Sequence, residues 1–83
     1  MSKKIIVYGA EWCAYCHEAM RYFDKLGVEY IYKNVELDPA DAKASMDKSG
    51  QTGIPVIDLD GTIVIGFNRA TIDQVLKDKK ITT

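Results

Sequence analysis

Cysteine and histidine are scarce in this chain, which has 83 residues but only two cysteines and one histidine. A closed zinc site needs about four ligands, drawn mostly from these two residue types. Three such side chains do not complete one, so the sequence does not predict a zinc centre within one chain. A purely structural disulfide is also poorly supported, because a bridge between Cys13 and Cys16 closes too short a loop to restrict the unfolded chain much.

The chain also lacks an excess of charge and a long apolar run. Its 11 basic and 12 acidic residues give a net charge of -1, so we expect no surface for nucleic acid. The apolar run at residues 5–8 is too short for a signal peptide or a membrane span. We therefore expect a cytoplasmic protein that forms one small domain over residues 1–83.

Hydrophobic periodicity alternates between strand and helix patterns along the chain. A strand pattern, a helix pattern and a second strand pattern open the sequence, and such a βαβ unit makes its two strands parallel. Asp60-Gly61 predicts a tight hairpin, so the last two strands should be antiparallel. The fold class is therefore α/β, a mixed sheet with helices on both faces. The expected elements are strands 4–8, 28–36, 56–59 and 62–65, and helices 14–26, 39–49 and 71 onward.

Residues typical of helix ends mark the first two helices. Gly27 is expected as a left-handed cap on the end of the first helix. Asp38 is expected to cap the start of the second helix, with Pro39 in its first position. Leu37 is expected to pack on Ala42 as a hydrophobic staple.

The second and third helices differ in the apolar faces that they offer. In the second helix only Ala42 and Met46 are in clear register, so this helix is expected to be peripheral. The third helix is expected to begin at Thr71, with Gln74 completing a capping box. Its buried stripe should consist of Ile72, Val75 and Leu76.

Cys13 and Cys16 stand where the first strand gives way to the first helix. A CxxC pair at a helix start offers an attacking thiolate and a second thiol that resolves the mixed disulfide. The helix dipole favours a thiolate at Cys13, whereas Cys16 falls on the apolar stripe. The pattern therefore predicts Cys13 as an exposed nucleophile and Cys16 as a buried resolving thiol. Glu11 would oppose the thiolate if it points inward, and His17 either assists it when protonated or only faces solvent.

The CxxCH segment is open to other uses. It matches the signature for c-type haem attachment, but it follows a buried strand and no export signal precedes it, which argues against haem. Two chains could each offer Cys13 to an iron–sulfur cluster, with small thiols completing the ligands. Two alternatives to an enzyme therefore stay open. One is a carrier of iron–sulfur clusters, and the other is a docking protein whose thiols take part in no reaction.

Trp12 and Pro55 are the other chemically distinctive residues. An indole beside the cysteines is more readily explained as a lid or a docking surface than as part of the core. Pro55 has no N–H for a strand ladder, so it is confined to a strand start or a special turn. If the Ile54–Pro55 bond is cis, the backbone of Ile54 would face an extended substrate.

Several segments together match one family pattern. Cys-Ala-Tyr-Cys-His at 13–17 is joined by Gly-Val at 27–28, by Gly-Gln-Thr-Gly-Ile-Pro-Val-Ile at 50–57 and by Ile-Gly-Phe at 65–67. On these segments the chain resembles the glutaredoxin-like members of the thioredoxin-fold superfamily over nearly its whole length. The resemblance implies strand order 2-1-3-4 and a redox-active Cys13–Cys16 disulfide, and we expect no metal and no tightly bound cofactor. It also implies a cis bond before Pro55 and a substrate groove formed by Trp12, Tyr15, Thr52, Ile54, Pro55, Gly66 and Phe67.

Departures from the typical glutaredoxin pattern bear on the reductant. Ala14 stands where these proteins have proline, Ala10 where they often have lysine, and residues 66–71 lack the acids that hold the glutathione amine. Gly66-Phe67 instead resembles the NrdH-type redoxins, which take electrons from thioredoxin reductase, and the overall pattern resembles the YruB-like group.

The resemblance and its departures together define the expected activity and partners. We expect a thiol–disulfide oxidoreductase that acts on protein or small-molecule disulfides. Thioredoxin reductase is its expected reductant, and glutathione stays open as a cosubstrate. A monomer is expected, with a dimer left open, and no nucleic acid or membrane partner is implied.

Overall fold

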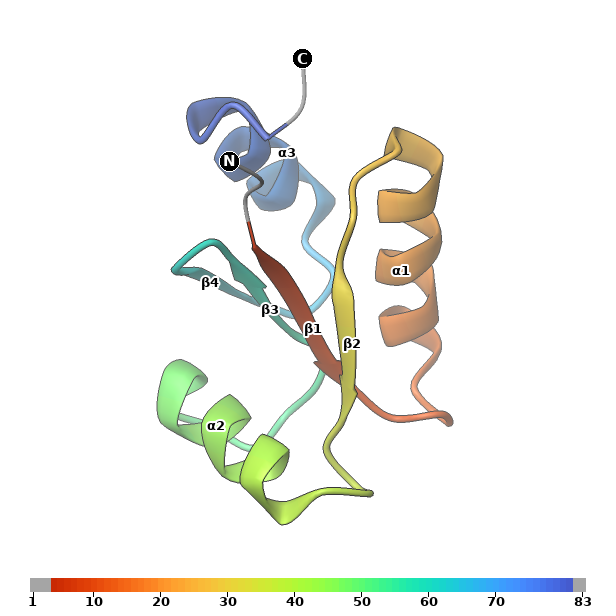
Figure 1. Ribbon diagram of the computed structural model, residues 1–83, viewed down its shortest axis with the longest axis vertical. Helices are drawn as coiled ribbons and strands as arrows, with labels where there is room; N and C mark the ends of the chain where they lie inside the picture. Colours follow the sequence, from red (N-terminus) through yellow and green to blue (C-terminus); the bar gives the residue numbers. More distant parts are fainter. Residues whose placement is uncertain (1–3, 82–83) are drawn as a thin grey trace.

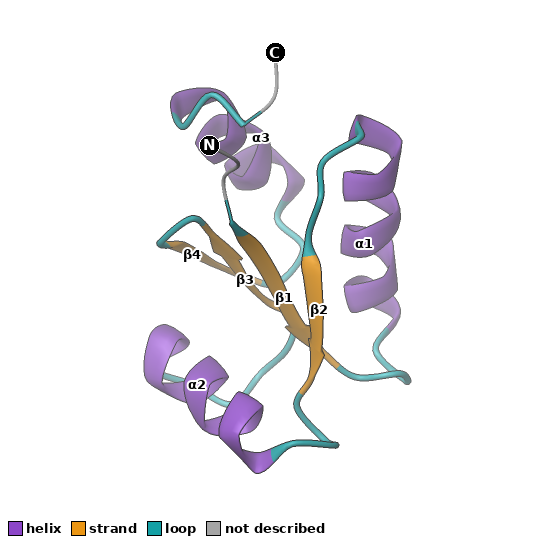
Figure 2. Ribbon diagram, viewed as in Figure 1, coloured by secondary structure: helices purple, strands orange, loops and turns teal. Residues whose placement is uncertain are grey.

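The computed structural model describes residues 4–81, so residues 1–3 and the last two residues lie outside it. Strands and helices follow the order β1-α1-β2-α2-β3-β4-α3 (Figures 1 and 2). The strands are β1 (Ile5–Gly9), β2 (Ile31–Asn34), β3 (Val56–Leu59) and β4 (Thr62–Ile65). The helices are α1 (Ala14–Leu26), α2 (Pro39–Ser49) and α3 (Arg69–Asp78).

The four strands form one mixed sheet in the order β2-β1-β3-β4, as predicted. β1 pairs with β2 in parallel, because α1 carries the chain back across the sheet between them. β1 pairs with β3 and β3 with β4 in antiparallel fashion. Asp60 and Gly61 make the predicted tight turn between β3 and β4, with positive φ angles of 52° and 103°.

Alternate residues of β1 face the two sides of the sheet. Ile5 and Val7 pack with residues of α1 and α3, and this core includes the fully buried ring of Phe23. Ile6 and Tyr8 belong to a smaller cluster on the other side, where Ala44 of α2 packs. Figure 1 shows the same division, with α2 apart from α1 and α3. Since β1 is buried along its whole length, it anchors both layers.

The ends of α1 and α2 are formed by the residues that the sequence indicates. Gly27 ends α1 in the left-handed conformation with φ 72°. The side chain of Asp38 accepts a hydrogen bond from the N–H of Ala40 at 2.9 Å, which caps α2. The predicted hydrophobic staple is wrong, because Leu37 is 81% exposed.

The packed face of α2 also differs from the prediction. Ala44 and Ser45 turn toward the sheet, and Ser45 is buried. Met46, expected in the apolar register, is 45% exposed. The thin apolar pattern of this helix left its orientation undetermined, and the polar contacts of its last turn fix it instead.

β2 and α3 have other boundaries than predicted. β2 is shorter than residues 28–36 because the N–H of Val28 bonds to the carbonyl of Phe23 at the end of α1. β1 ends at Gly9, opposite Asn34, and pairing with β2 ends there too. α3 begins before Thr71 because Asn68 caps it, its side chain accepting from the Thr71 N–H at 3.2 Å.

Candidate functional site

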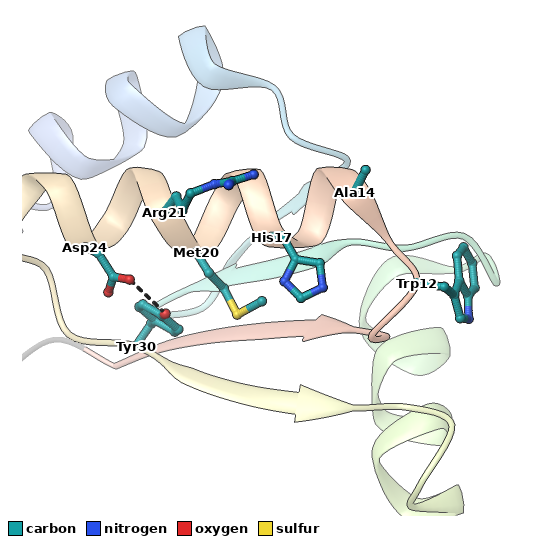
Figure 3. A pocket seen from close by; sticks show the side chains of 7 residues that line it. All are labelled: Trp12, Ala14, His17, Met20, Arg21, Asp24 and Tyr30. Atoms are coloured by element: carbon teal, nitrogen blue, oxygen red, sulfur yellow. Dashed lines mark hydrogen bonds between the residues drawn. The ribbon is translucent and has the colours of Figure 1, made fainter.

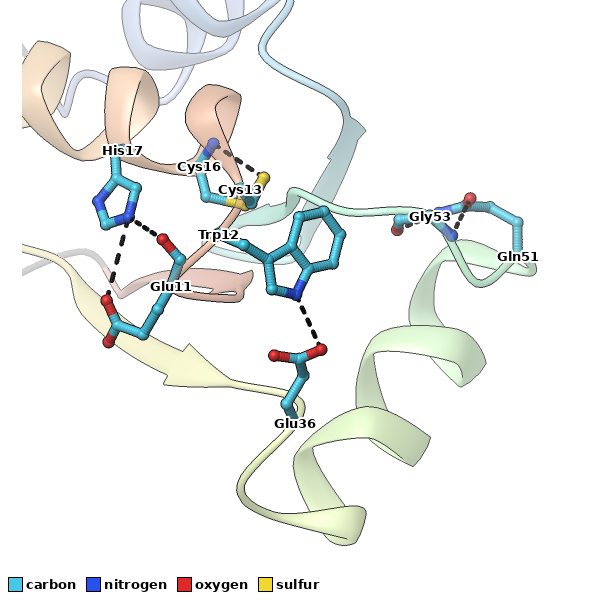
Figure 4. Close-up of a disulfide and its surroundings, with 8 residues drawn as sticks. All are labelled: Glu11, Trp12, Cys13, Cys16, His17, Glu36, Gln51 and Gly53. Carbon is cyan, nitrogen blue, oxygen red and sulfur yellow. Dashed lines mark hydrogen bonds and ion pairs between the residues drawn. A yellow bond between two sulfur atoms is a disulfide. The ribbon is translucent and has the colours of Figure 1, made fainter.

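The two cysteines form a disulfide at the start of α1 (Figure 4). Their Cα atoms lie 5.2 Å apart. Cys13 is the N-cap of the helix, and its Sγ accepts a hydrogen bond from the Cys16 N–H at 3.1 Å. The first turn of α1 carries no acidic residue. In the dithiol form this backbone donor and the positive end of the helix dipole would both favour a thiolate at Cys13.

The burial of the two cysteines is less unequal than the sequence suggests. Cys16 is fully buried, as predicted, but Cys13 is only 5% exposed. The expectation of an exposed Cys13 is therefore wrong for the disulfide form. Its side chain is covered because both cysteines cluster with Ala10 and with the partly buried Ile54.

Gly9, the last residue of β1, makes room for the buried sulfur. A Cβ atom on Gly9 would lie 2.6 Å from the Sγ of Cys16 and 2.9 Å from its Cβ. It would also lie 3.4 Å from the ring of Tyr32 on β2. The close packing of α1 on β1 at the disulfide therefore requires glycine at this position.

Trp12 forms the outer lip of the site, with its indole 69% exposed. Its Nε1–H donates to the carboxylate of Glu36 at 2.8 Å (Figure 4). On the same lip the Nε2 of His17 lies 2.7 Å from the backbone carbonyl of Glu11. A carbonyl only accepts, so Nε2 carries the proton in this contact. The Glu11 carboxylate lies 4.0 Å from the same nitrogen and points away from the disulfide (Figure 4).

The opposite wall consists of the segment around Pro55. The Ile54–Pro55 bond is cis, as the resemblance implies. The carbonyl of Pro55 accepts from the N–H of Gly66 at 2.8 Å, which ties this wall to the end of β4. Thr52 is exposed in the loop before it, and Tyr15 is 68% exposed on the first turn of α1. Ile54 joins this wall to the cysteine cluster, and the contacts of these residues with substrate remain a prediction.

A glutamine side chain supports the loop in front of this wall. Gln51 donates from Nε2 to the carbonyl of Gly53 at 2.9 Å and accepts from the Gly53 N–H at 2.5 Å. The amide thus binds both backbone groups of one residue (Figure 4). These two hydrogen bonds restrain the chain just before Ile54.

Phe67 packs mainly against the core. Its ring meets Tyr22 edge to face, with centroids 5.9 Å apart. The guanidinium of Arg69 lies 4.5 Å from the centre of the same tyrosine ring, and the Tyr22 hydroxyl donates to Asp73. These contacts join α1 to α3 and give Phe67 a packing role, while its part in the substrate groove stays a prediction.

An open hollow of about 620 Å³ lies beside the disulfide, along α1 (Figure 3). It begins at the lip and continues toward the far end of the helix. Its lining consists of Trp12, Ala14, His17, Met20, Arg21, Asp24 and Tyr30. The two cysteines are not among these residues, so the hollow flanks the redox centre and does not enclose it.

Glu36, Gly9 and Tyr32 belong to the site but were not singled out from the sequence. The carboxyl ends of two parallel strands meet at one edge of a sheet, and this rule would have placed Glu36 beside the residues that follow β1. No sequence signal marks Tyr32. Its hydroxyl is buried and has no hydrogen-bond partner among the described residues. Burial raises the pKa of Tyr32, and the negative charges of Glu11 and Glu36 raise it further.

Two kinds of feature are absent from residues 4–81. No group of three or more histidine, cysteine, aspartate or glutamate side chains is placed to hold a metal ion there. Within the same residues, none of the helices combines the length and the apolar character that crossing a bilayer requires.

A cysteine pair at a helix start, opposite a cis-proline on a mixed four-stranded sheet, defines a thioredoxin-fold protein for thiol–disulfide redox chemistry. Residues 5–64 match the family model described as Glutaredoxin. The chain therefore belongs to the glutaredoxin family.

Individual relatives agree with this assignment. The chain is 32% identical over 73 residues to an uncharacterized glutaredoxin-like 8.6 kDa protein in the rubredoxin operon of Clostridium pasteurianum, covering 88% of this chain and 97% of that one. The glutaredoxin-like NrdH-redoxin of Escherichia coli is 25% identical with a TM-score of 0.76, over 86% of this chain and 92% of that one. The buckwheat glutaredoxin–glutathione complex shares the fold at 22% identity and a TM-score of 0.69, over 93% and 71% of the two chains.

Proposed function

We propose that the protein is a dithiol oxidoreductase that reduces disulfides of proteins or small molecules through Cys13 and Cys16. The observation that carries this proposal is the hydrogen bond from the Cys16 N–H to the Cys13 Sγ at the start of α1. This donor distinguishes the two sulfurs, because it favours negative charge on Cys13. Cys16 is the thiol without any exposure. Cys13 is therefore the nucleophile and Cys16 the resolving thiol.

The reaction has two exchange steps. The Cys13 thiolate attacks one sulfur of the substrate disulfide, which forms a mixed disulfide and releases the other substrate sulfur as a thiolate. Cys16 then loses its proton to solvent and attacks the Cys13 sulfur. The second substrate thiolate leaves, and the Cys13–Cys16 disulfide forms. Two electrons have passed to the substrate, and a reductant must return them to the cysteine pair.

The walls of the site are assigned to substrate binding. Trp12 and Tyr15 offer large exposed aromatic surfaces beside the disulfide. Ile54 packs against the cluster that contains both cysteines, so a substrate bound to Cys13 would lie along its backbone. We assign pairing with the extended substrate to this backbone, and contact with the bound chain to Thr52, Pro55, Gly66 and Phe67.

Thioredoxin reductase is the reductant that we propose, acting in a reducing compartment such as the cytoplasm. Two sequence departures support this choice over glutathione. Ala10 offers no cation for a glutathione carboxylate. Near the cap of α3, residues 66–71 offer no acid for the glutathione amine.

Single-cysteine variants test the order of the two steps. Cys13→Ser should abolish turnover, whereas Cys16→Ser should still attack substrate and accumulate the mixed disulfide, detectable by intact mass. Alkylation of the reduced protein at mildly acidic pH should label Cys13 first. Preferential labelling of Cys16, or a trapped adduct on Cys16 alone, would reverse the assignment.

The reductant is tested by two coupled assays run side by side. One supplies glutathione with its reductase, the other thioredoxin reductase, and both supply NADPH and the same oxidised protein. We expect faster NADPH oxidation with thioredoxin reductase. A clear preference for glutathione would contradict the proposed reductant but leave the dithiol mechanism standing.

A further inference from the structure

Two carboxylates stand on one side of the disulfide, where strand β2 ends. Glu11 immediately precedes Trp12, and its side chain is 73% exposed. Glu36 is also exposed and holds the Trp12 indole through a hydrogen bond of 2.8 Å. Figure 4 shows both carboxylates on the side of β2, away from the wall that contains Gly53. The exposed indole is therefore flanked by negative charge.

Nearby basic side chains are engaged elsewhere. Lys33 lies 3.8 Å from Asp41, and Arg21 lies 2.5 Å from Glu18. Within residues 4–81, Glu36 forms no ion pair, and the one formed by Glu11 is its 4.0 Å contact with His17, whose charge depends on protonation. The negative charge beside Trp12 is thus largely available to a visiting molecule.

The fields of the two carboxylates meet close to the redox centre. Both raise the pKa of the same phenol, Tyr32, in addition to the larger effect of its burial. The Tyr32 ring and the Cys16 sulfur lie against the same residue, Gly9. The two carboxylates therefore act on one region, which packs next to the Cys16 side of the disulfide.

We propose that Glu11 and Glu36 select substrates, favouring polypeptide disulfides with lysine or arginine beside the reacting cysteine. Trp12 supplies the apolar contact, and the two carboxylates attract the flanking cations. The same charge repels anionic disulfides such as glutathione disulfide. This inference rests on the proposed function, because it concerns which disulfides reach Cys13.

The test compares two cystine peptides that differ only in the residues beside each cysteine, arginine in one and glutamate in the other. Reduced protein is mixed with each peptide and with glutathione disulfide, and the second-order rate constant is measured at low ionic strength. Each rate constant is divided by that of dithiothreitol with the same disulfide, because flanking charge also changes the intrinsic reactivity of a disulfide.

The key variant is Glu11→Gln with Glu36→Gln. Glutamine at position 36 keeps an oxygen that can accept the hydrogen bond from the Trp12 indole. The change therefore removes the charge and leaves the position of Trp12 supported. The matched control is Glu29→Gln with Asp47→Asn, which removes two exposed charges from other parts of the chain. Thermal unfolding followed by circular dichroism shows whether each variant is folded.

The wild-type protein should prefer the arginine peptide by about five-fold or more, given two exposed charge pairs. This preference should shrink in about 0.5 M sodium chloride, where screening is strong. It should also shrink in the key variant but not in the control. The key variant should reduce glutathione disulfide faster than the wild type does.

Equal corrected rates for both peptides, or an unchanged preference in a folded key variant, would overturn the selection proposal. If the key variant does not fold, the salt dependence of the wild type decides in its place, and a preference that is insensitive to salt would overturn the proposal. A wild-type protein that reduces none of the three disulfides would overturn the proposed function itself, which is a different result.

Discussion

The two faces of the sheet are held in different ways. On the side of α1 and α3 the core is apolar, and the Phe23 ring is fully buried within it. On the side of α2 the contact depends on Lys48, whose Nζ donates to Asp58 at 2.7 Å and to the Tyr8 hydroxyl at 2.9 Å. The other oxygen of Asp58 accepts from the N–H of Gly61 at 2.7 Å, which links the network to the hairpin turn.

This difference separates the redox centre from the network of Lys48 and Asp58. The disulfide lies at the start of α1, where tight apolar packing fixes the two sulfurs. The face of α2 combines a smaller apolar cluster with these charged contacts, so part of its stability depends on protonation. Burial lowers the pKa of Lys48, but hydrogen bonds and charge from Asp58 and Tyr8 outweigh this effect and raise it overall. Removing apolar volume from the face of α1 and removing charge from the face of α2 should therefore change the free energy of unfolding in different ways.

The largest effect is expected from Phe23→Ala on the apolar face. Loss of a fully buried phenylalanine ring should lower the free energy of unfolding by about 3–5 kcal/mol. A small domain has little stability to spare, so much of the protein should be unfolded. Urea denaturation measures the loss, and a change below about 1 kcal/mol would show that this face does not depend on its packing.

Gly9→Ala tests the close approach of strand and disulfide. The added methyl should cost about 1–3 kcal/mol by overpacking, because it meets the Cys16 side chain. In a Cys16→Ala background the sulfur is gone, so the same change should cost less. A double-mutant cycle measures this coupling. Equal costs in both backgrounds would show that the strain does not come from the sulfur.

Asp58→Asn tests the charged network on the opposite face. It should lower the free energy of unfolding by about 1–3 kcal/mol, because Lys48 loses its charged partner. Asp47→Asn is the matched control, since Asp47 pairs with Lys43 in an exposed position on α2, the helix that carries Lys48. The control should leave stability unchanged within error. Similar losses in both variants would mean that burial adds nothing to the Lys48–Asp58 pair.

The smallest effect is expected at alkaline pH. A lysine whose pKa is raised by folding adds stability that is fully present below its unfolded value, about 10.4. This stability is lost as pH rises through the folded value. The wild type should therefore lose more stability than Lys48→Met in that range, as measured by urea denaturation at several pH values. Parallel pH profiles for the two proteins would contradict the assignment.

Local signals in the sequence predicted most of the fold. Asp38, Pro39 and Gly27 mark helix ends through their own backbone preferences, so they act as predicted. Leu37 does not act as a staple, since its side chain is 81% exposed. Asn68 competed with Thr71 as the cap of α3, and both residue types are strong caps.

The site was predicted in part for the same reason. The CxxC spacing and the helix start place Cys13 and Cys16 without reference to the rest of the chain. The burial of Cys13 depends on Ile54, far along the sequence. The contact between Trp12 and Glu36 also joins distant segments, and no local pattern encodes it.

The strand β2 forms one border of the sheet, with β1 as its partner in the described part of the chain. The outer backbone groups of a border strand can pair with the same strand of another molecule and start aggregation. β2 has only four residues and carries Lys33 among them. A short border strand with a charge resists such pairing. The length and the charge of β2 thus disfavour edge-to-edge pairing between two copies of the chain.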